Sequence, residues 1–450
     1  MTSNKKILAL VFVCVVLVMN VWAQNPIIRD QFSADPTARV FNGKVYLFPS
    51  HDILAPPDKN LRENWFCMAD YHVFSSENLS DWTDHGVIVS QEKVPWVDST
   101  SYSMWAPDCV EKNGKYYFYF PANTNVAGPN GRKGFGIGVA VADKPEGPYI
   151  PQAKPIEGIH GIDPVVMIDK NGQAYIYWSM GNIYVAKLKD NMLELDSEPV
   201  AIQNLPEKGL KEGPFVFERN GIYYLTFPHV ENNIERLEYA IGDSPVGPFK
   251  MTGVIMDESP MNCWTNHHSL IDFKGQWYLF YHQNAYSPKF DKNRSVCIDS
   301  LFFNPDGTIQ KVVPTNRGVG ITSAENEIQI DRYSEIGGEA SIDLLDSTNT
   351  FAGWKTVFDG KGAWVRYNAV EFGRKMKKVQ VKAMSKYGGA LEIRLDKVDG
   401  PVVAELTIPK GSDLTTIEAK ISKIKPGLHD LVVVSKTGAA VEVDYLRFVK

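Results

Sequence analysis

Five residues with polar or aromatic side chains stand at matching positions along the chain, each eight or nine residues before a glycine in a tight turn. In chain order they are Asp35, Trp105, Asp163, Glu212 and His267. Three of them are carboxylic acids. If the fold brings the five positions together, these carboxyl groups could divide the roles of proton donor and proton acceptor, which is the chemistry of general acid–base catalysis.

Each acid also has a structural interpretation. Asp35 and Asp163 precede prolines, and an Asp-Pro pair commonly begins a turn. Glu212, in the stretch KEGPF, would be unremarkable alone. The shared register favours chemistry, because carboxylates that meet repel one another and lose hydration, which costs stability. We therefore expect a chain that places three acids together to use them.

Short strands must position these residues. Each turn opens a stretch rich in β-branched and aromatic residues, such as NGKVYLFPS from Asn42, which is typical of a β-hairpin. A strand, a polar turn and another strand follow, so every unit offers four strands. Five such units predict an all-β, five-bladed β-propeller, in which the first strand of each blade lines a central channel. The five register residues would then meet at one mouth of that channel.

A cluster of this composition fits hydrolysis of a glycosidic bond. That reaction needs one carboxylic acid to protonate the leaving oxygen, and its inverting form needs a second carboxylate that activates water from the opposite face of the sugar. Acids on different blades can face one another across the wide gap that inversion requires. A third carboxylate nearby raises the pKa of the acid, and the indole of Trp105 can stack on a sugar face.

The five stretches together resemble the five-bladed glycoside hydrolases of family 43, which include α-L-arabinofuranosidases and β-xylosidases. The resemblance covers about residues 25 to 322. It implies that Asp35 is the general base, that Asp163 tunes the pKa of the acid and orients it, and that Glu212 is the general acid. The stretches that carry it are DPTARVFNGKVYLFPSHD, MWAPDCVEKNGKYYFYFPA, GIDPVVMIDKNGQAYIYW, KEGPFVFERNGIYYLTFP and NHHSLIDFKGQWYLFYHQN.

The resemblance also implies roles for residues around the pocket. His267 matches an axial histidine that often lies beside a channel ion, commonly calcium, or a water; a hydrogen-bonded structural histidine is the alternative. Arg294 matches an arginine that reaches into the pocket, with a blade-to-blade ion pair as its alternative. Further candidates for contact with sugar are His51, Asp52, Phe66, Trp178 and Phe215. For the aromatic residues among them, the alternative is a place in the core.

The tail has a different character. From about residue 327 it carries more Lys, Val and Glu and short alternating strands, which predict a separate β-sandwich of the jelly-roll kind. The tail resembles a family 6 carbohydrate-binding module, which implies a structural calcium near Asp331 and Asp444. The loop KGSDLTTIEA lacks the sugar-stacking tryptophan common in that family. Sugar binding by Trp354 and Tyr367 and a purely structural module therefore both stay open.

The N-terminus predicts export. Lys5 and Lys6 precede an apolar run from Ile7 to Met19, and small residues allow cleavage after Ala23. The apolar run is short for a membrane span, so we expect a protein without membrane insertion, located in the periplasm or outside the cell. The resulting division is a signal peptide at 1–23, a propeller at 24–326 and a sandwich at 327–450.

Bulk composition narrows the function further. Hydrophobic residues make up 44% of the 450-residue chain, and the net charge of −6 lacks the basic footprint of nucleic-acid binding. Four cysteines follow the leader; their wide spacing predicts buried thiols, with at most one bridge. We expect a monomer without an organic cofactor.

The sequence thus predicts an inverting glycosidase that removes pentose residues from plant polysaccharides or oligosaccharides, with α-L-arabinofuranosyl favoured over β-xylosyl. The alternatives are an endo-xylanase or endo-arabinanase, a galactosidase or galactofuranosidase, and a propeller that binds carbohydrate without catalysis.

Overall fold

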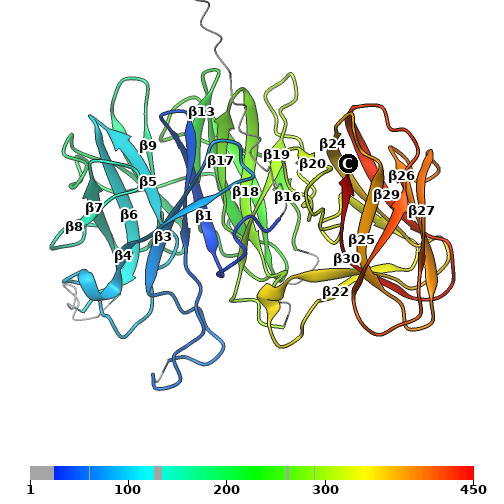
Figure 1. The fold of residues 1–450 in the computed structure, drawn as a ribbon. Coiled ribbons are helices and arrows are strands. Elements are labelled where there is room, and N and C mark those ends of the chain that lie inside the picture. Colours follow the sequence, from blue (N-terminus) through cyan, green and yellow to red (C-terminus); the bar gives the residue numbers. More distant parts are fainter. Residues whose placement is uncertain (1–24, 60, 126–133, 260–262, 288) are drawn as a thin grey trace, which may run out of the picture.

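The structure is a computed structural model that describes residues 25–59, 61–125, 134–259, 263–287 and 289–450. The predicted signal peptide, 1–23, lies outside the described residues. Regular structure is almost entirely β-strand (Figure 1), and the helical turns among the described residues are two short 3-10 helices, η1 (Gln91–Lys93) and η2 (Thr350–Ala352). Neither is long and apolar enough to cross a membrane.

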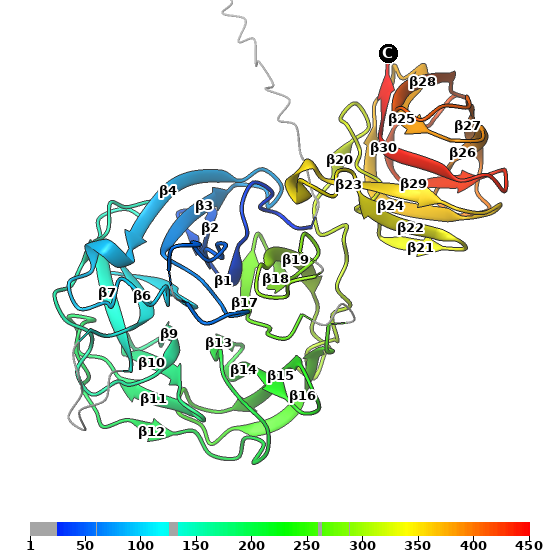
Figure 2. The ribbon, with the colours of Figure 1, turned by 90° about the horizontal axis from the view of Figure 1, so that it is seen from below.

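Five antiparallel sheets are arranged in a ring about a central axis, as the view in Figure 2 shows, so the first part of the chain is a five-bladed β-propeller. Within each sheet the strands pair in chain order. Blade one consists of β1 (Ala34–Phe41), β2 (Lys44–Ser50), β3 (Asp70–Ser76) and β4 (Thr83–Ser90), and blade two of β5 (Asp108–Lys112), β6 (Lys115–Asn123), β7 (Phe135–Ala142) and β8 (Ile150–Pro151). Blade three consists of β9 (Ile162–Ile168), β10 (Ala174–Ser179), β11 (Ile183–Lys187) and β12 (Val200–Ala201), and blade four of β13 (Phe215–Arg219), β14 (Ile222–Val230), β15 (Glu235–Gly242) and β16 (Lys250–Met256).

Blade five differs from the expected four strands. Its sheet contains β17 (Ser269–Phe273), β18 (Gln276–Gln283) and β19 (Ser295–Leu301). The segment expected to form the outer strand makes one isolated bridge, from Phe303 to Ile309. The intervening turn folds this segment back on itself, because Asn304 accepts from the Gly307 N–H and donates to the Thr308 carbonyl.

The tight turns explain why the repeats fold as hairpins. At four of the five turns both central residues have positive φ, as for Asn42 (51°) and Gly43 (78°). This is the geometry of the turn whose twist matches that of the flanking strands. The turn at Asn171 and Gly172 departs from it, since only the glycine has positive φ (83°).

The N-terminal segment closes the ring. The Ile27 N–H donates to Val296 O, and the Ser33 N–H donates to Arg294 O, so residues before β1 lie along β19. The side chain of Asn25 also binds β19. It donates to Ile298 O at 3.0 Å and accepts from the Ile298 N–H at 2.8 Å. Blade one and blade five are therefore joined by hydrogen bonds between segments more than 250 residues apart in sequence.

The tail folds as a β-sandwich of two sheets around its own core (Figure 1). Strand β20 already pairs with β24, so this sheet begins at Thr322, a few residues before the expected boundary. One sheet has the order β20-β24-β29-β26-β27 with β21 also on β24, and the other has the order β22-β23-β30-β25-β28. The strands are β20 (Thr322–Ser323), β21 (Glu335–Gly337), β22 (Ala340–Leu344), β23 (Trp354–Phe358), β24 (Trp364–Phe372), β25 (Lys378–Met384), β26 (Gly389–Leu395), β27 (Val402–Ile408), β28 (Thr415–Lys420), β29 (Gly427–Ser435) and β30 (Val441–Val449).

An aromatic cluster docks the sandwich on the propeller. Trp354 packs edge-on against Tyr286, with ring centroids 5.9 Å apart, and Phe351 lies 4.8 Å from Phe32. Arg332 strengthens the junction by donating to Asn25 O at 2.6 Å. Trp354 is only 9% exposed and Tyr367 is fully buried, so the structure does not offer either ring as a sugar-stacking surface.

The four cysteines of the described chain are free, buried thiols. The prediction of buried thiols is confirmed, and the structure shows no bridge between Cys67, Cys109, Cys263 and Cys297.

We expect Trp354→Ala to weaken the docking of the sandwich. Removing a buried tryptophan costs about 3–5 kcal/mol of folding free energy, and here the loss falls on the junction with Tyr286. Differential scanning calorimetry should show the unfolding transition of the variant at lower temperature. Tyr387→Ala is the matched control, because that ring is 68% exposed. Equal transition temperatures for both variants would contradict the docking role of Trp354.

Candidate active site

A pocket lies at the mouth of the channel, where the first strands of the blades meet. Asp35 stands in β1 and Asp163 in β9, whereas Glu212 and His267 lie in the loops just before β13 and β17. All four line the pocket together with Trp105, so the structure brings together the five residues that share a register in the sequence. The other lining residues are Trp65, Phe66, Met68, Ala106, Ile162, Trp264, Thr265, Asn266 and Arg294.

Backbone geometry aims two of the acids into the pocket. Asp35 and Asp163 have φ of 46° and 56°, in the left-handed region that few residues other than glycine adopt. Both lie where the pairing of their strand shifts register, next to Ala34 in β1 and next to Ile162 in β9. Such irregularities re-aim a side chain, and aspartate tolerates this backbone conformation better than most residues.

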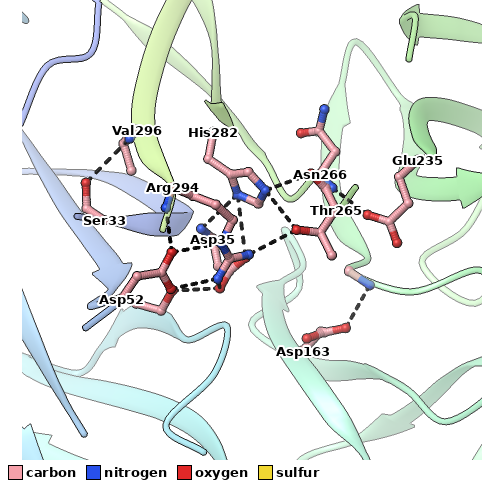
Figure 3. Close-up of polar contacts among 12 residues, drawn as sticks. Ser33, Asp35, Asp52, Asp163, Glu235, Thr265, Asn266, His282, Arg294 and Val296 are labelled. Carbon is pink, nitrogen blue, oxygen red and sulfur yellow. Dashed lines mark hydrogen bonds and ion pairs between the residues drawn. The ribbon is translucent and has the colours of Figure 1, made fainter. Parts of the chain in front are cut away.

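Arg294 fixes Asp35 from the neighbouring blade. Its Nη1 and Nη2 donate to the two Asp35 oxygens at 2.8 and 3.1 Å. Its Nε and Nη2 donate to the two Asp52 oxygens at 2.9 Å each. Its Nη1 also donates to Thr265 Oγ1 at 3.2 Å. Figure 3 shows the guanidinium between the two carboxylates. These contacts use all the donors that a guanidinium has. Arg294 is therefore held rigidly, and it holds Asp35 in one orientation.

The surroundings keep Asp35 ionised. Burial alone would raise its pKa, but the charge of Arg294 and a hydrogen bond from Ser50 Oγ at 2.6 Å outweigh burial, and the pKa of Asp35 falls to about 2. A neutral imidazole supports the backbone: His282 Nδ1 accepts from the Asp35 N–H at 3.1 Å, and Nε2 donates to Thr265 O at 2.9 Å. Burial lowers the pKa of His282 to about 3, so this ring stays uncharged at neutral pH.

A second group of carboxyls retains its protons more strongly. Asp163, Glu212 and Glu235 take part in none of the ion pairs found within the described residues. Burial raises the pKa of all three, and the charge of Glu212 raises the pKa of Asp163 and of Glu235 further. Because like charges in one buried site cannot all form together, this group holds protons to a higher pH than Asp35 does.

Glu235 was missed by the sequence interpretation. It is the first residue of β15, is 1% exposed, accepts a hydrogen bond from the Asn266 N–H and lies against Glu212. A signal was present in the alternation of side chains. Glu235, Leu237 and Tyr239 share one face of β15, and the other two are buried and apolar, so an acid at this position interrupts an apolar pattern.

Several predicted sugar contacts lie behind the pocket wall. Asp52 binds Arg294, Trp178 stacks on Tyr184 with centroids 5.8 Å apart, and Phe215 packs against the Arg39 guanidinium. The lining residues include none of the three. Trp178 and Phe215 belong to strands that pack between blades, where the alternation of the strand turns their rings into the core.

Indoles from loops complete the pocket. The Phe66 ring lies 5.3, 6.1 and 6.5 Å from the rings of Trp65, Trp105 and Trp264, so four aromatic rings form one wall. Trp65 and Trp264 were not predicted, because they lie in loops and have no fixed position relative to the turn glycines. The wall offers the flat apolar faces on which a sugar ring packs.

The residues predicted to bind calcium are His267 in the propeller and Asp331 and Asp444 in the sandwich, and their side chains have other partners or few free ligand atoms. Burial lowers the pKa of His267 to about 4, so its neutral ring could bind a cation or a water, but the nearby Asp35 carboxylate is already held by Arg294. In the sandwich, Asp331 pairs with Arg332 at 3.0 Å and Asp444 with Lys382 at 2.9 Å. Calcium takes about six to eight oxygen ligands, so neither place presents a complete protein site.

Comparison with known proteins connects this geometry to a family. The sequence pattern of glycosyl hydrolases family 43 matches residues 23–309, and that of the carbohydrate binding module family 6 matches residues 335–450. The chain belongs to glycosyl hydrolase family 43. It is a glycosidase, and the pocket at the channel mouth is the candidate for its active site.

Similar proteins cover either the propeller or both parts. Xylosidase/arabinosidase 43A of Humicola insolens is 38% identical over 63% of this chain and 98% of its own length. An arabinoxylan arabinofuranohydrolase of Paenibacillus polymyxa is 27% identical over 94% of this chain and 74% of its own length. A family 43 β-xylosidase/α-arabinofuranosidase from a compost microbial metagenome, solved with xylotriose in a calcium-free form, shares 33% identity, with a TM-score of 0.58 over 65% of this chain and 98% of that chain.

We expect Asp163→Asn to move the alkaline limb of the pH dependence of kcat/KM to lower pH. Glu212 raises the pKa of Asp163, and like charges repel in both directions, so the pair holds its last proton to a higher pH than either carboxyl would alone. With Asp163 replaced, Glu212 loses that proton at a lower pH, and the protonated form needed to donate disappears earlier as pH rises. Profiles of kcat/KM report these free-enzyme ionisations.

Asp169→Asn is the matched control for this experiment. Asp169 is a buried acid of the same blade that accepts from Tyr223 at 2.7 Å and does not line the pocket. Its variant should keep the alkaline limb of the wild-type protein. An unmoved limb in Asp163→Asn would show that this carboxyl does not set the pKa of Glu212.

Proposed function

We propose that this glycosidase removes single pentose residues, α-L-arabinofuranosyl or β-D-xylosyl, from plant xylans and their oligosaccharides with inversion at the anomeric carbon. The observation that carries the proposal is the separation of the buried carboxyls into two kinds. Asp35 is kept ionised by Arg294, while Asp163, Glu212 and Glu235 have raised pKa values. Groups whose surroundings push their pKa values apart are suited to opposite roles in acid–base chemistry.

Asp35 is suited to activate water. A carboxylate has about four acceptor positions, and Arg294 and Ser50 occupy three of those on Asp35. One position is then left for a water molecule on the pocket side. In the proposed reaction that water gives its proton to Asp35 as its oxygen attacks the anomeric carbon.

Glu212 is suited to protonate the leaving oxygen. Its burial raises the pKa, so a larger share of molecules carries the proton at neutral pH. Asp163 is anchored for a supporting role, since its Oδ2 accepts from the Gly213 N–H, the amide next to Glu212, at 3.0 Å. This hydrogen bond ties the position of the donor to the position of Asp163.

Gly213 explains how the segment KEGPF can lie so close to the His267 side chain. Gly213 has φ of 52°, and a Cβ added there would lie 2.9 Å from His267 Nδ1. A larger residue would push the channel histidine and the Glu212 loop apart. The glycine thus permits Glu212 and His267 to line one pocket.

The sugar specificity rests on similarity together with the pocket wall. The Humicola relative is named for both xylose and arabinose, a relative that spans both parts is named for arabinofuranose on arabinoxylan, and another relative, of Aspergillus niger, is named for galactofuranose. This supports α-L-arabinofuranosyl as the first candidate and β-D-xylosyl as the second. The aromatic wall does not by itself choose between the two sugars, because it offers flat apolar faces on which either ring can pack.

The proposal extends to the setting of the enzyme. We propose that the basic and apolar leader directs export to the periplasm or the outside, where polysaccharide fragments are found, and that the enzyme works as a monomer. We assign calcium only a structural role, as an ion held in the channel by His267 and water. No step of bond cleavage is assigned to it.

A screen of para-nitrophenyl glycosides followed by proton NMR tests the substrate and the stereochemistry. We expect turnover of the α-L-arabinofuranoside and the β-D-xyloside, with β-arabinofuranose and α-xylose as the first products. The β-D-galactofuranoside serves as the competing substrate. Retained anomers would refute inversion, and binding of all three glycosides without turnover would indicate a carbohydrate-binding propeller.

We expect Glu212→Gln to lose most activity on substrates with poor leaving groups. An alcohol needs protonation to depart, whereas a dinitrophenolate barely does, so the loss should reach about 10²–10⁴-fold on xylo-oligosaccharides and be much smaller on a dinitrophenyl glycoside. Asp35→Asn is the matched comparison and should damage both substrates, because each reaction needs activated water. Equal losses for Glu212→Gln on both substrates would exclude it as the proton donor.

A further inference from the structure

Blade one carries a separate group of potential metal ligands outside the pocket. His51 follows β2, and Asp70 and His72 belong to β3. Among the residues described by the structure, these form the set of three such side chains whose ligand atoms all lie within 4.8 Å of one another. Their side chains are 15–23% exposed, so the group lies at the surface but is partly shielded.

Strand geometry explains the convergence. Asp70 and His72 are two residues apart and therefore point to the same face of β3. Leu47 pairs with Phe74 between β2 and β3, and Asp52 forms a bridge with Met68 further along. His51 lies between these points and contacts Asp70. Two adjacent strands thus deliver two imidazoles and one carboxylate to one spot.

The separations between the three side chains lie on either side of those between ligands of one ion. His51 Nδ1 is hydrogen-bonded to Asp70 Oδ1 at 2.7 Å, and His72 Nε2 lies 4.0 Å from the same oxygen. Ligands at zinc-like bond lengths of about 2.0–2.2 Å in a tetrahedral arrangement stand about 3.3–3.6 Å apart. An ion bound between these atoms would replace the hydrogen bond between His51 and Asp70, and the side chains would shift to bring both separations to this value.

Asp84 supplies an independent feature typical of metal sites. Its carboxylate lies 3.0 Å from His72 Nδ1, and it is itself fixed by the Gly86 N–H at 2.7 Å. Histidines that bind metals usually donate their second ring N–H to a carboxylate, which fixes the ring and its tautomer. With Nδ1–H directed at Asp84, the lone pair of His72 Nε2 faces Asp70.

We propose that His51, Asp70 and His72 bind one divalent transition-metal ion of the zinc class, with Asp84 as the outer partner of His72. Two imidazoles and one carboxylate suit zinc, cobalt or nickel better than calcium or magnesium, which prefer oxygen ligands alone. Three protein ligands leave a fourth position for water.

The position of His51 gives the ion a structural effect on the pocket. His51 is flanked by Ser50, which donates to Asp35, and by Asp52, which accepts from Arg294. An ion bound to His51 would restrain the segment that supports the proposed base. The ion is therefore a positioning element, and its binding does not depend on the proposed substrate.

Metal binding is tested on the full chain, without a histidine tag and after treatment with EDTA. Isothermal titration with Zn²⁺ and visible absorption with Co²⁺ should show saturable binding of one ion in the wild-type protein. His72→Ala and Asp70→Asn should abolish it, and Asp84→Asn should weaken it by about 10- to 100-fold. His85→Ala is the matched control, because this exposed histidine of the same blade binds Ser75 instead.

Thermal unfolding provides a second readout that also checks the fold of each variant. Zn²⁺ should raise the transition temperature of the wild type and of His85→Ala, since a ligand of the native state stabilises it. It should leave folded Asp70→Asn unchanged. Absence of saturable binding in the wild type, equal binding by all variants, or thiolate charge-transfer bands with Co²⁺ would each overturn the proposal.

Discussion

The buried guanidinium of Arg294 is the contact on which the candidate site depends. It lies between Asp35 and Asp52, and all three side chains are shielded from water. Removing one partner of such a group typically costs about 3–5 kcal/mol, because an uncompensated charge stays buried. The same contact joins blade one, which supplies the two aspartates, to blade five, where Arg294 precedes β19. The contacts that close the ring are therefore also the contacts that orient Asp35. The hydrogen bond from the Ser33 N–H to Arg294 O supports both.

The single cation also explains why carboxyls so close together behave differently. Among the described acids, Arg294 forms ion pairs with Asp35 and Asp52. Its charge lowers the pKa of Asp35, whereas burial raises the pKa of Glu212. A propeller suits such an arrangement because each blade brings its own surroundings to a shared axis. On one side of the mouth Asp35 forms an ion pair with Arg294, and on the other side Asp163, Glu212 and Glu235 form no ion pair with a described residue. The division between base and acid follows from where the cation is placed rather than from the type of acid.

The sequence predicted the fold and the register of the site because both are periodic. Glycine turns fix the hairpins, and counting back from them finds Asp35, Asp163 and Glu212. Features without periodicity escaped this reasoning. Trp65 and Trp264 reach the pocket from loops, and Glu235 reaches Glu212 from the third strand of its blade. Trp178 shows the opposite error, since an aromatic residue at the end of a hairpin strand turned out to be buried between sheets. Whether a ring faces a pocket or a core is decided by packing between blades, which short-range patterns do not record.

The segment from Ser50 to Asp52 shows how one strand end serves two sites. Successive side chains of an extended strand point to opposite faces. Ser50 and Asp52 therefore point inward behind the pocket wall, where they contact Asp35 and Arg294, and His51 points the other way toward Asp70. A displacement of the His51 backbone would also move Ser50 and Asp52, because the three residues are consecutive in the chain. A ligand on the outer face is thus mechanically connected to the orientation of the proposed base without entering the pocket.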